Sequence, residues 1–250
     1  MRIAVAGGTG TVGRHVTRTA REAGHDVVVL SRASGANVLT GEGVTEALAG
    51  VDAVIDVTSI MTLSEKRARD FFSTGTRTLL AAEAEVGVAH HVALSIVGID
   101  GIDTAYYAAK LAQERAVAAG TIPHTIVRAA QFHEFAGQVL AQIAGPFAVA
   151  PRTLMRPVAA REVAAHVVRV AEAGPVGRAQ DLVGPRDETL VDVARRQLAF
   201  DGIRRRVLDV KLPGAYGRGL ASGLLRGGPD ALQGAITFDE WLHSPDHARG

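Results

Sequence analysis

Two adjacent tyrosines, Tyr106 and Tyr107, lie four and three residues before Lys110 in the segment TAYYAAKLAQE at 104–114. On a helix, either spacing brings a phenol and an ammonium group onto one face. A phenol has an unperturbed pKa of about 10, and a neighbouring positive charge favours its ionised form at lower pH. Lysine is rare in this chain, with only three among the 27 basic residues. A lysine retained at this position therefore favours an acid–base pair, and the spacing alone leaves both tyrosines open.

A serine that could hold a carbonyl oxygen follows an apolar stretch. Ser95 ends the segment HHVALS at 90–95, which has the pattern of a buried strand. The carboxyl ends of parallel strands are where ligands bind in open α/β sheets. Together, Ser95, a tyrosine and Lys110 could reduce a carbonyl, with a hydride from a nicotinamide and a proton from the phenol. The alternatives are a serine that caps a turn and a tyrosine that is buried only for packing.

Three glycines are spaced as in a dinucleotide-binding loop. The segment IAVAGGTGTVGRHV places Gly7, Gly10 and Gly13 between an expected strand and an expected helix. Glycines at these positions allow a tight turn, close approach of a pyrophosphate and close packing of helix on strand. The backbone amides near Thr11 and Val12 then face the anion at the positive end of the helix dipole. The loop lacks the GK[ST] ending of a nucleoside triphosphatase.

The end of the second expected strand indicates which dinucleotide is bound. A cofactor with free ribose hydroxyls is usually held there by an acidic residue, but no acid occurs between Val27 and Gly41. Arg32 instead offers donors that can bind a 2′-phosphate, and Ser31 can add a hydroxyl. The sequence therefore predicts NADP(H), and the alternative for Arg32 is a surface arginine that stacks on the adenine.

Alternating strands and helices must position these residues. Short apolar runs at 2–6, 26–31, 52–57, 90–95 and 124–128 predict buried strands, and a weaker strand is expected at 37–39. Helical patterns lie between them, including an amphipathic helix at 64–85, the YYAAK helix and a helix at about 133–143. This alternation predicts an α/β fold with a doubly wound parallel sheet. We expect one domain over residues 1–250, of which about 146–250 contributes a small C-terminal substrate lobe.

The amino-acid composition argues against several classes of binding partner. The chain has 27 basic and 26 acidic residues and no cysteine, so neither nucleic-acid binding nor disulfide formation is expected. No stretch is long and apolar enough to suggest a membrane span. His243 and His247 lie four apart, but Pro245 between them interrupts a helix, so no metal site is predicted. We expect a cytoplasmic monomer or homodimer that acts on a small-molecule substrate.

Taken together, GGTGTVG, the strand end VALS and YYAAK resemble the short-chain dehydrogenase/reductase superfamily, specifically its atypical, NmrA-like branch. The later segments VRAAQFHEF and GPDALQGAITFDEWL also fit this branch, although its RPxxF motif is RAAQF here. The resemblance implies a Rossmann fold. Its YxxxK spacing selects Tyr106 as proton donor, with Lys110 as its partner and Ser95 as the serine that holds the carbonyl; Tyr107 would face elsewhere.

We therefore expect an NADPH-dependent oxidoreductase that reduces a carbonyl, enone or quinone-like substrate, in which Lys110 lowers the pKa of Tyr106. Phe132, His133 and Phe135 are expected to line an apolar pocket, or else to pack a helix on the small lobe. The residues expected to bind the cofactor are Gly7, Thr9, Gly10, Thr11, Val12, Gly13, Ser31, Arg32, Val57, Thr58 and Lys110. One alternative function is a non-catalytic NADP(H)-binding sensor, and a weaker one is an epimerase or dehydratase acting on a nucleotide sugar.

Overall fold

The computed structural model describes residues 1–62 and 64–247, and the chain divides into two compact units. The first unit comprises Met1–Ser95, Asp103–Arg128 and Arg161–Ala179, and the second comprises Ile96–Ile102, Ala129–Ala160 and Gln180–Gly250. The expected lobe at 146–250 thus overlaps the second unit without coinciding with it, because the segment Arg161–Ala179 returns to the first unit.

A parallel sheet forms the core of the first unit. Its strands lie in the order β5-β4-β3-β1-β2, with β8 (Gly177–Arg178) also paired to β5. Their bounds are Arg2–Ala6 for β1, Asp26–Leu30 for β2, Ala53–Asp56 for β3, His90–Ile96 for β4 and His124–Ala129 for β5. The pairs β1–β2, β1–β3 and β3–β4 are parallel. Parallel neighbours need crossover connections, which is why helices alternate with these strands.

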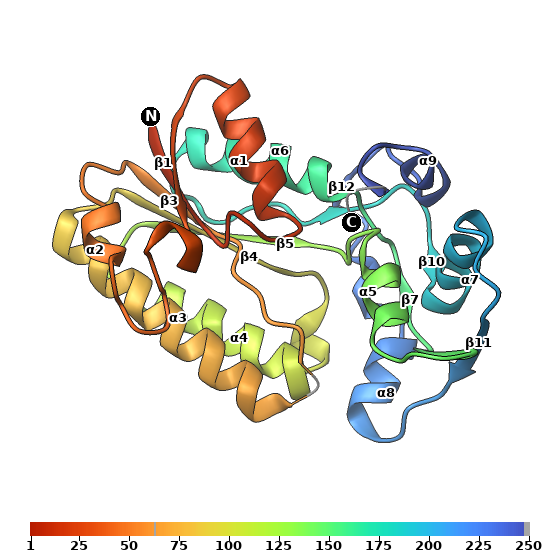
Figure 1. The fold of residues 1–250 in the computed structure, drawn as a ribbon. Coiled ribbons are helices and arrows are strands. Elements are labelled where there is room, and N and C mark those ends of the chain that lie inside the picture. The colour runs from red at the N-terminus through yellow and green to blue at the C-terminus, as the bar shows by residue number, and fades with distance from the viewer. Residues whose placement is uncertain (63, 248–250) are drawn as a thin grey trace. The chain divides into compact units, whose positions relative to one another are not determined.

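Helices cover both faces of this sheet. In Figure 1, α1 (Gly13–Glu22) and α6 (Ala160–Ala173) lie on one side, whereas α3 (Glu65–Val86) and α4 (Ala105–Ala118) lie on the other. The short helix α2 (Val44–Ala47) contributes Val44 to a core with Ala4, Leu30 and Leu79. The predicted α/β class and doubly wound parallel sheet are confirmed.

Two adjacent histidines show how one strand contacts both helical layers. The Nδ1 atom of His90 in β4 lies 3.4 Å from the carbonyl oxygen of Ala171 in α6. His91, the next residue, contacts Glu83 in α3, with 2.8 Å between Nδ1 and Oε1. Neighbouring side chains of a strand point to opposite faces, so the two histidines cannot chelate one ion together.

The weak strand expected at 37–39 does not form. The carboxamide of Asn37 accepts the backbone N–H of Leu39 at 3.0 Å, and the Asn37 carbonyl accepts the N–H of Gly41 at 2.8 Å. An asparagine that bonds to the backbone two residues ahead closes a local turn. This turn competes with strand pairing at these residues.

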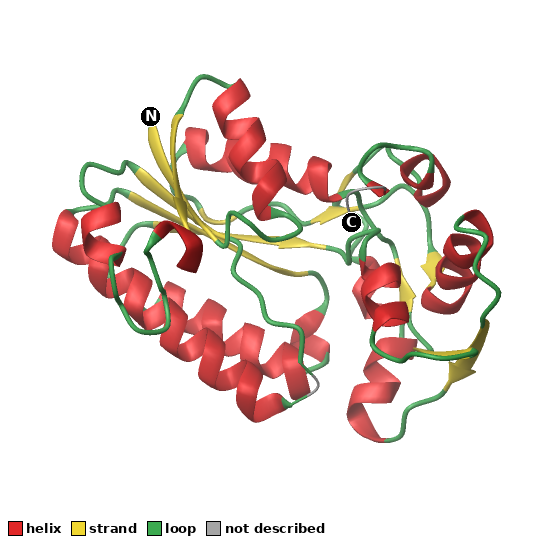
Figure 2. Ribbon diagram, viewed as in Figure 1, coloured by secondary structure: helices red, strands yellow, loops and turns green. Residues whose placement is uncertain are grey.

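The second unit is built from short elements, visible in Figure 2 as short strands and helices. The strand β6 (Phe147–Pro151) pairs in parallel with β11 (Arg206–Val210), and β7 (Leu154–Met155) pairs antiparallel with β10 (Glu188–Thr189). Ala129 at the end of β5 pairs with β9 (Leu182–Val183), which also pairs with β12 (Leu232–Gln233). The helices are α5 (Phe135–Ala141), α7 (Leu190–Phe200), α8 (Gly214–Ala221) and α9 (Phe238–Leu242).

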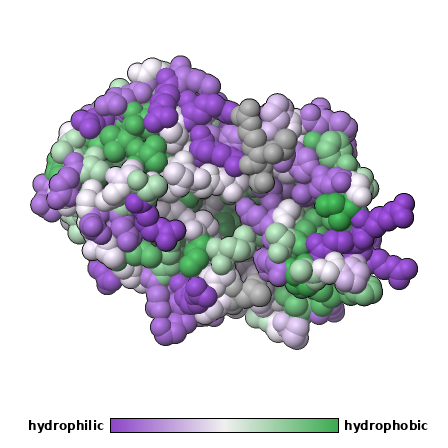
Figure 3. Space-filling view, in the orientation of Figure 1, coloured by the Kyte–Doolittle hydropathy of each residue, from purple (hydrophilic) through white to green (hydrophobic). Residues whose placement is uncertain are grey.

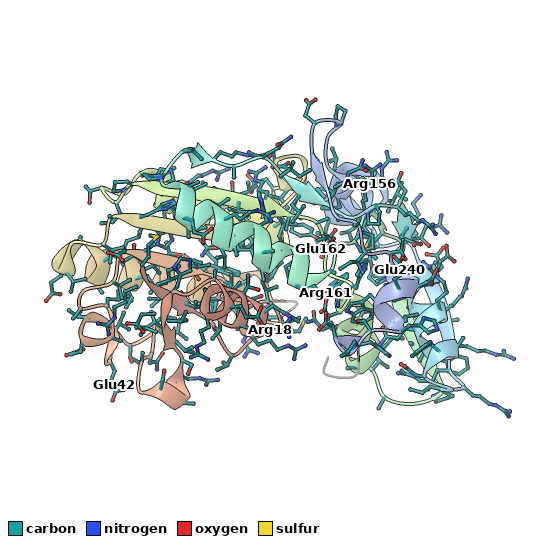
Figure 4. The ribbon with its side chains drawn as sticks, turned by 90° about the horizontal axis from the view of Figure 1, so that it is seen from above. Arg18, Glu42, Arg156, Arg161, Glu162 and Glu240 are labelled. Atoms are coloured by element: carbon teal, nitrogen blue, oxygen red, sulfur yellow. The ribbon has the colours of Figure 1, made fainter. Side chains whose placement is uncertain are left out.

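Local sequence signals fix the helix ends. The helix α3 begins after Ser64, whose hydroxyl accepts the N–H of Arg67. It ends at Val86 and is followed by Gly87, whose φ is 77°. The helix α9 begins with a capping box, in which Glu240, labelled in Figure 4, accepts the N–H of Thr237 at 2.8 Å. The helix expected at 133–143 is shorter, because α5 spans only Phe135–Ala141.

Polar and apolar side chains are interspersed over the face drawn in Figure 3. Within the described ranges, no helix combines the length and the apolar character that crossing a bilayer requires.

Candidate functional site: a dinucleotide loop and a buried lysine

The glycine loop is shaped by positions where a side chain cannot fit. Gly7 has a φ of +78°, and a Cβ there would lie 3.0 Å from the Cα of Thr58. A Cβ on Gly13 would lie only 2.0 Å from the Gly7 carbonyl oxygen. The turn is closed by the N–H of Gly10, which donates to that same oxygen at 2.9 Å. The three glycines identified from the sequence thus form one tight loop between β1 and α1.

The start of α1 presents free donors. The backbone amides of Val12 and Gly13 meet no acceptor among the residues that the structure describes. Thr9 and Gly10 are exposed beside them. Amides at a helix N-terminus bind anions, because their N–H groups and the helix dipole both favour negative charge. This cradle fits the pyrophosphate of a dinucleotide.

Arg32, the residue predicted to bind a 2′-phosphate, follows the end of β2 and is free to contact a ligand. Arg32 is exposed, and its guanidinium has no ion-pair or hydrogen-bond partner in the described part of the chain. It opens the 3-10 turn η1 (Arg32–Ser34), where Ser31 Oγ accepts the N–H of Ser34 at 3.2 Å. Ser31 therefore caps this turn with its hydroxyl, and the cap holds Arg32 at the carboxyl edge of the sheet.

The end of β3 carries a buried carboxylate that the sequence reasoning overlooked. Asp56 is 1% exposed, and its Oδ1 accepts both the N–H of Thr58 at 2.9 Å and the Thr58 hydroxyl at 2.6 Å. The N–H of Val57 donates to the Ala6 carbonyl at 3.0 Å. Val57 and Thr58 are thus fixed against the glycine loop, whose Gly7 leaves no room for a side chain beside Thr58.

Lys110 is buried inside the first unit. It is 4% exposed, and its Nζ donates to the Leu94 carbonyl at 2.7 Å and to Oε1 of Gln113. The ammonium also lies 4.6 Å from the centroid of the Phe72 ring. Burial lowers the pKa of Lys110 to about 8, although the charges of Asp56 and Glu114 oppose this shift. The lysine is therefore held in place by fixed acceptors.

Tyr106 is bonded to a residue beside the cofactor segment. Its hydroxyl lies 3.0 Å from Oγ of Ser59, which directly follows Thr58. Burial raises the pKa of Tyr106, and the hydrogen bond with Ser59 opposes this only partly. The expectation that Lys110 lowers this pKa is therefore corrected, because the lysine ammonium is bonded to Leu94 and Gln113 instead of to the phenol. Tyr107 is buried, as expected for the tyrosine that faces elsewhere.

Ser95 lies at the predicted strand end. It is 3% exposed in β4, and its Oγ has no hydrogen-bond partner within the described residues. A buried hydroxyl without a partner is costly unless a ligand or water satisfies it. This observation is compatible with a substrate-holding serine, a role that remains a prediction.

The three aromatic residues expected at a pocket belong to the second unit. His133 is buried, its Nε2 lies 3.0 Å from the Ile236 carbonyl, and its ring packs against Phe238 and Trp241. His133 thus packs inside the second unit, which corresponds to the alternative to a pocket-lining role that was expected from the sequence. Phe132 and Phe135 are half-buried, so their place in a substrate pocket remains a prediction.

Comparison with known proteins agrees with this geometry. Residues 7–173 match the model of the NAD(P)H-binding family. The chain belongs to this family. The NAD(P)H-binding character that the resemblance implied is thereby confirmed. Arg32, the glycine loop and the α1 amides all lie in or beside the matched region.

One curated relative of this NAD(P)H-binding protein is similar over part of its length. The Photosystem II assembly factor Ycf39 of Synechocystis sp. (strain ATCC 27184 / PCC 6803 / Kazusa) is 32% identical over 111 residues, which cover 39% of this chain and 34% of that protein. The chain thus spans about a third of the length of the curated relative it matches.

Two solved structures share the fold over almost the whole chain. The NADPH-dependent quinone oxidoreductase QOR2 of Escherichia coli, complexed with NADPH, is 19% identical with a TM-score of 0.73, covering 99% of this chain and all of that one. The triphenylmethane reductase of Citrobacter sp., complexed with NADP(H), is 17% identical with a TM-score of 0.72, covering 97% and 99%. At such identities the likeness establishes the fold alone.

The residues missed by sequence reasoning are Asp56 and Gln113. Asp56 carried a signal, since a charged residue inside the apolar run DAVIDV needs a buried partner. Gln113 also carried one, because it lies three residues after Lys110 on the same helix. Nothing in the sequence indicated that Ser59 would meet Tyr106.

Proposed function

We propose that this protein binds NADP(H) and reduces a carbonyl, enone or quinone-like small molecule. The observation that carries this proposal is the hydrogen bond between the Tyr106 hydroxyl and Ser59, at 3.0 Å. It places a phenol beside the segment Val57–Thr58, which packs against the glycine loop. A proton donor thus lies close to the chain segment that would hold the cofactor.

The residues present fit NADPH. The glycine loop and the amides of Val12 and Gly13 would hold the pyrophosphate, and Arg32 would bind the 2′-phosphate. When bound, NADPH supplies the hydride for the reduction. The preference for NADPH over NADH rests on Arg32 and on the absence of an acid at this strand end.

Tyr106 would deliver the proton in this reaction. The phenol is protonated near neutral pH, as a general acid requires, and burial raises its pKa further above its ordinary value. Ser95, whose buried hydroxyl has no hydrogen-bond partner among the described residues, would orient the substrate oxygen. Lys110, held by the Leu94 carbonyl and Gln113, would lie one helical turn from Tyr106.

The solved neighbours support this class of substrate. By name, one is an NADPH-dependent quinone oxidoreductase, and the other is a triphenylmethane reductase complexed with NADP(H).

The test measures NADPH oxidation against a panel of quinones, enones and ketones for the parent, Tyr106→Phe and the matched control Tyr107→Phe. We expect Tyr106→Phe to bind NADPH like the parent and to turn over about 10²- to 10⁴-fold more slowly, the usual contribution of a general acid. The control should retain turnover. If the parent turns over a substrate and Tyr106→Phe does so equally well, the assigned role of Tyr106 is wrong.

A second candidate is a non-catalytic NADP(H)-binding protein that acts through a protein partner. The observation that favours it is the 32% identity with a protein named as an assembly factor, over 111 residues. Intact NADPH binding without turnover of any panel member by the parent would support this candidate over the first.

A further inference from the structure

We propose that Asp56 and Gln113 form a buried bridge that positions Lys110 and links it to the cofactor segment Val57–Thr58. We call these two side chains the Asp56–Gln113 bridge. The inference deepens the proposed function, because it assigns positioning residues to a lysine of that site.

The bridge is a continuous chain of hydrogen bonds. Thr58 donates to Oδ1 of Asp56 through its N–H at 2.9 Å and its hydroxyl at 2.6 Å. The other carboxylate oxygen, Oδ2, accepts Nε2 of Gln113 at 2.9 Å. The carboxamide oxygen of Gln113 then accepts Nζ of Lys110. One carboxylate therefore connects the turn after β3 to the ammonium on α4.

The partners leave only one orientation for the Gln113 carboxamide. Lys110 can only donate, so it must face the amide oxygen. Asp56, when ionised, can only accept, so it must face the amide nitrogen. A flipped carboxamide would oppose donor to donor at one end and acceptor to acceptor at the other.

Because the Asp56–Gln113 bridge is buried, the loss of one of its hydrogen bonds is costly. Asp56, Lys110 and Gln113 are 1%, 4% and 3% exposed, so water cannot readily replace a lost bond. The other contacts of the ammonium are the Leu94 carbonyl on β4 and the Phe72 ring on α3. The charged groups that act on it are Asp56 and Glu114, and their attraction opposes the lowering of its pKa by burial.

Substitutions can break the donor–acceptor pairing of the bridge and can restore it. In Asp56→Asn, the new amide nitrogen faces that of Gln113 and forces the carboxamide to turn its donors toward Lys110. In Gln113→Leu, both bonds are lost. In the double variant Asp56→Asn/Gln113→Glu, the asparagine donates to the glutamate and the glutamate accepts from Lys110, with the net charge unchanged. The double variant therefore rebuilds the bridge.

The first readout follows Lys110 directly. The chain has only three lysines, Lys66, Lys110 and Lys211, so ¹³Cε-lysine labelling gives three NMR signals, assigned with Lys66→Arg and Lys211→Arg. We expect Lys110 to titrate at about pH 8 in the parent. In both single variants it should titrate at a lower pH, because an acceptor or a negative charge is lost, and the double variant should move back toward the parent.

The second readout is the dissociation constant for NADPH. Both single variants lose the hydrogen bond from the Lys110 ammonium to the Gln113 carboxamide oxygen. One hydrogen bond to a charged group corresponds to about tenfold in affinity, so each single variant should bind NADPH about tenfold more weakly. The double variant should recover to within about threefold of the parent. Gln197→Leu, which removes a buried glutamine in the second unit, is the matched control and should leave both readouts unchanged.

The bridge is refuted if Lys110 titrates as in the parent in both single variants, or if the double variant is no better than Asp56→Asn. If Asp56→Asn does not fold, Gln113→Leu decides the question alone. Failure of the proposed function has a different signature: the parent would not bind NADPH, while the Lys110 titration would still test the bridge.

Discussion

Replacing Arg32 with alanine should selectively weaken NADPH binding. The Arg32 side chain is exposed and has no hydrogen-bond or ion-pair partner within the described ranges, so its removal breaks no such interaction there. A hydrogen bond to a charged group contributes about 1.5–3 kcal/mol, which corresponds to about 10- to 150-fold in affinity. Because an exposed charge is screened by salt, we expect the lower end, about tenfold, near physiological ionic strength.

Fluorescence titration of NADPH and NADH against parent and variant measures this effect. NADH lacks the 2′-phosphate, so its dissociation constant should stay within about twofold, and the NADPH effect should shrink in about 1 M salt. Arg204→Ala removes another exposed arginine that has no ion-pair or hydrogen-bond partner in the described part of the chain. It is the control and should change neither affinity. If Arg32→Ala weakens both cofactors equally, or neither, Arg32 does not read the phosphate.

Three further predictions concern the scaffold of the site. Glu114→Leu breaks a buried ion pair, in which Glu114 Oε2 lies 2.6 Å from Nη2 of Arg128. The substitution should lower the free energy of unfolding by about 3–5 kcal/mol. A loss below about 1 kcal/mol, measured by urea titration, would show that the pair contributes little. His91→Gln tests a buried pair with Glu83: burial favours the neutral ring, but the hydrogen bond and charge of Glu83 outweigh it and raise the pKa of His91. The His91–Glu83 pair should therefore stabilise the fold fully below about pH 6.5, and this stabilisation should decline as the pH rises through the pKa of His91 in the folded protein. If the free energy of unfolding of parent and variant changes with pH in the same way, this expectation is wrong. Gly13→Ala should abolish NADPH binding, because its Cβ would lie 2.0 Å from a loop carbonyl; near-parent affinity by calorimetry would show that the loop can shift.

Local physics made much of this protein readable from its sequence. The glycine spacing predicted the loop because only glycine tolerates the backbone approach seen at Gly13. Apolar runs of strand length predicted the five central strands, since strands covered by helices on both faces are apolar throughout. The same reasoning failed at 37–39, where the side chain of Asn37 closes a turn.

Only the tertiary structure decided how the chemical groups act on one another. Asp56 and Gln113 are 57 residues apart in sequence, and they meet because β3 and α4 belong to the same layered unit. The pKa of Tyr106 is raised because burial outweighs its hydrogen bond to Ser59, and burial depends on packing from many segments. Sequence spacing placed Tyr106 and Lys110 on one helix, but the direction of each polar group was set by the partners that the fold brought to it.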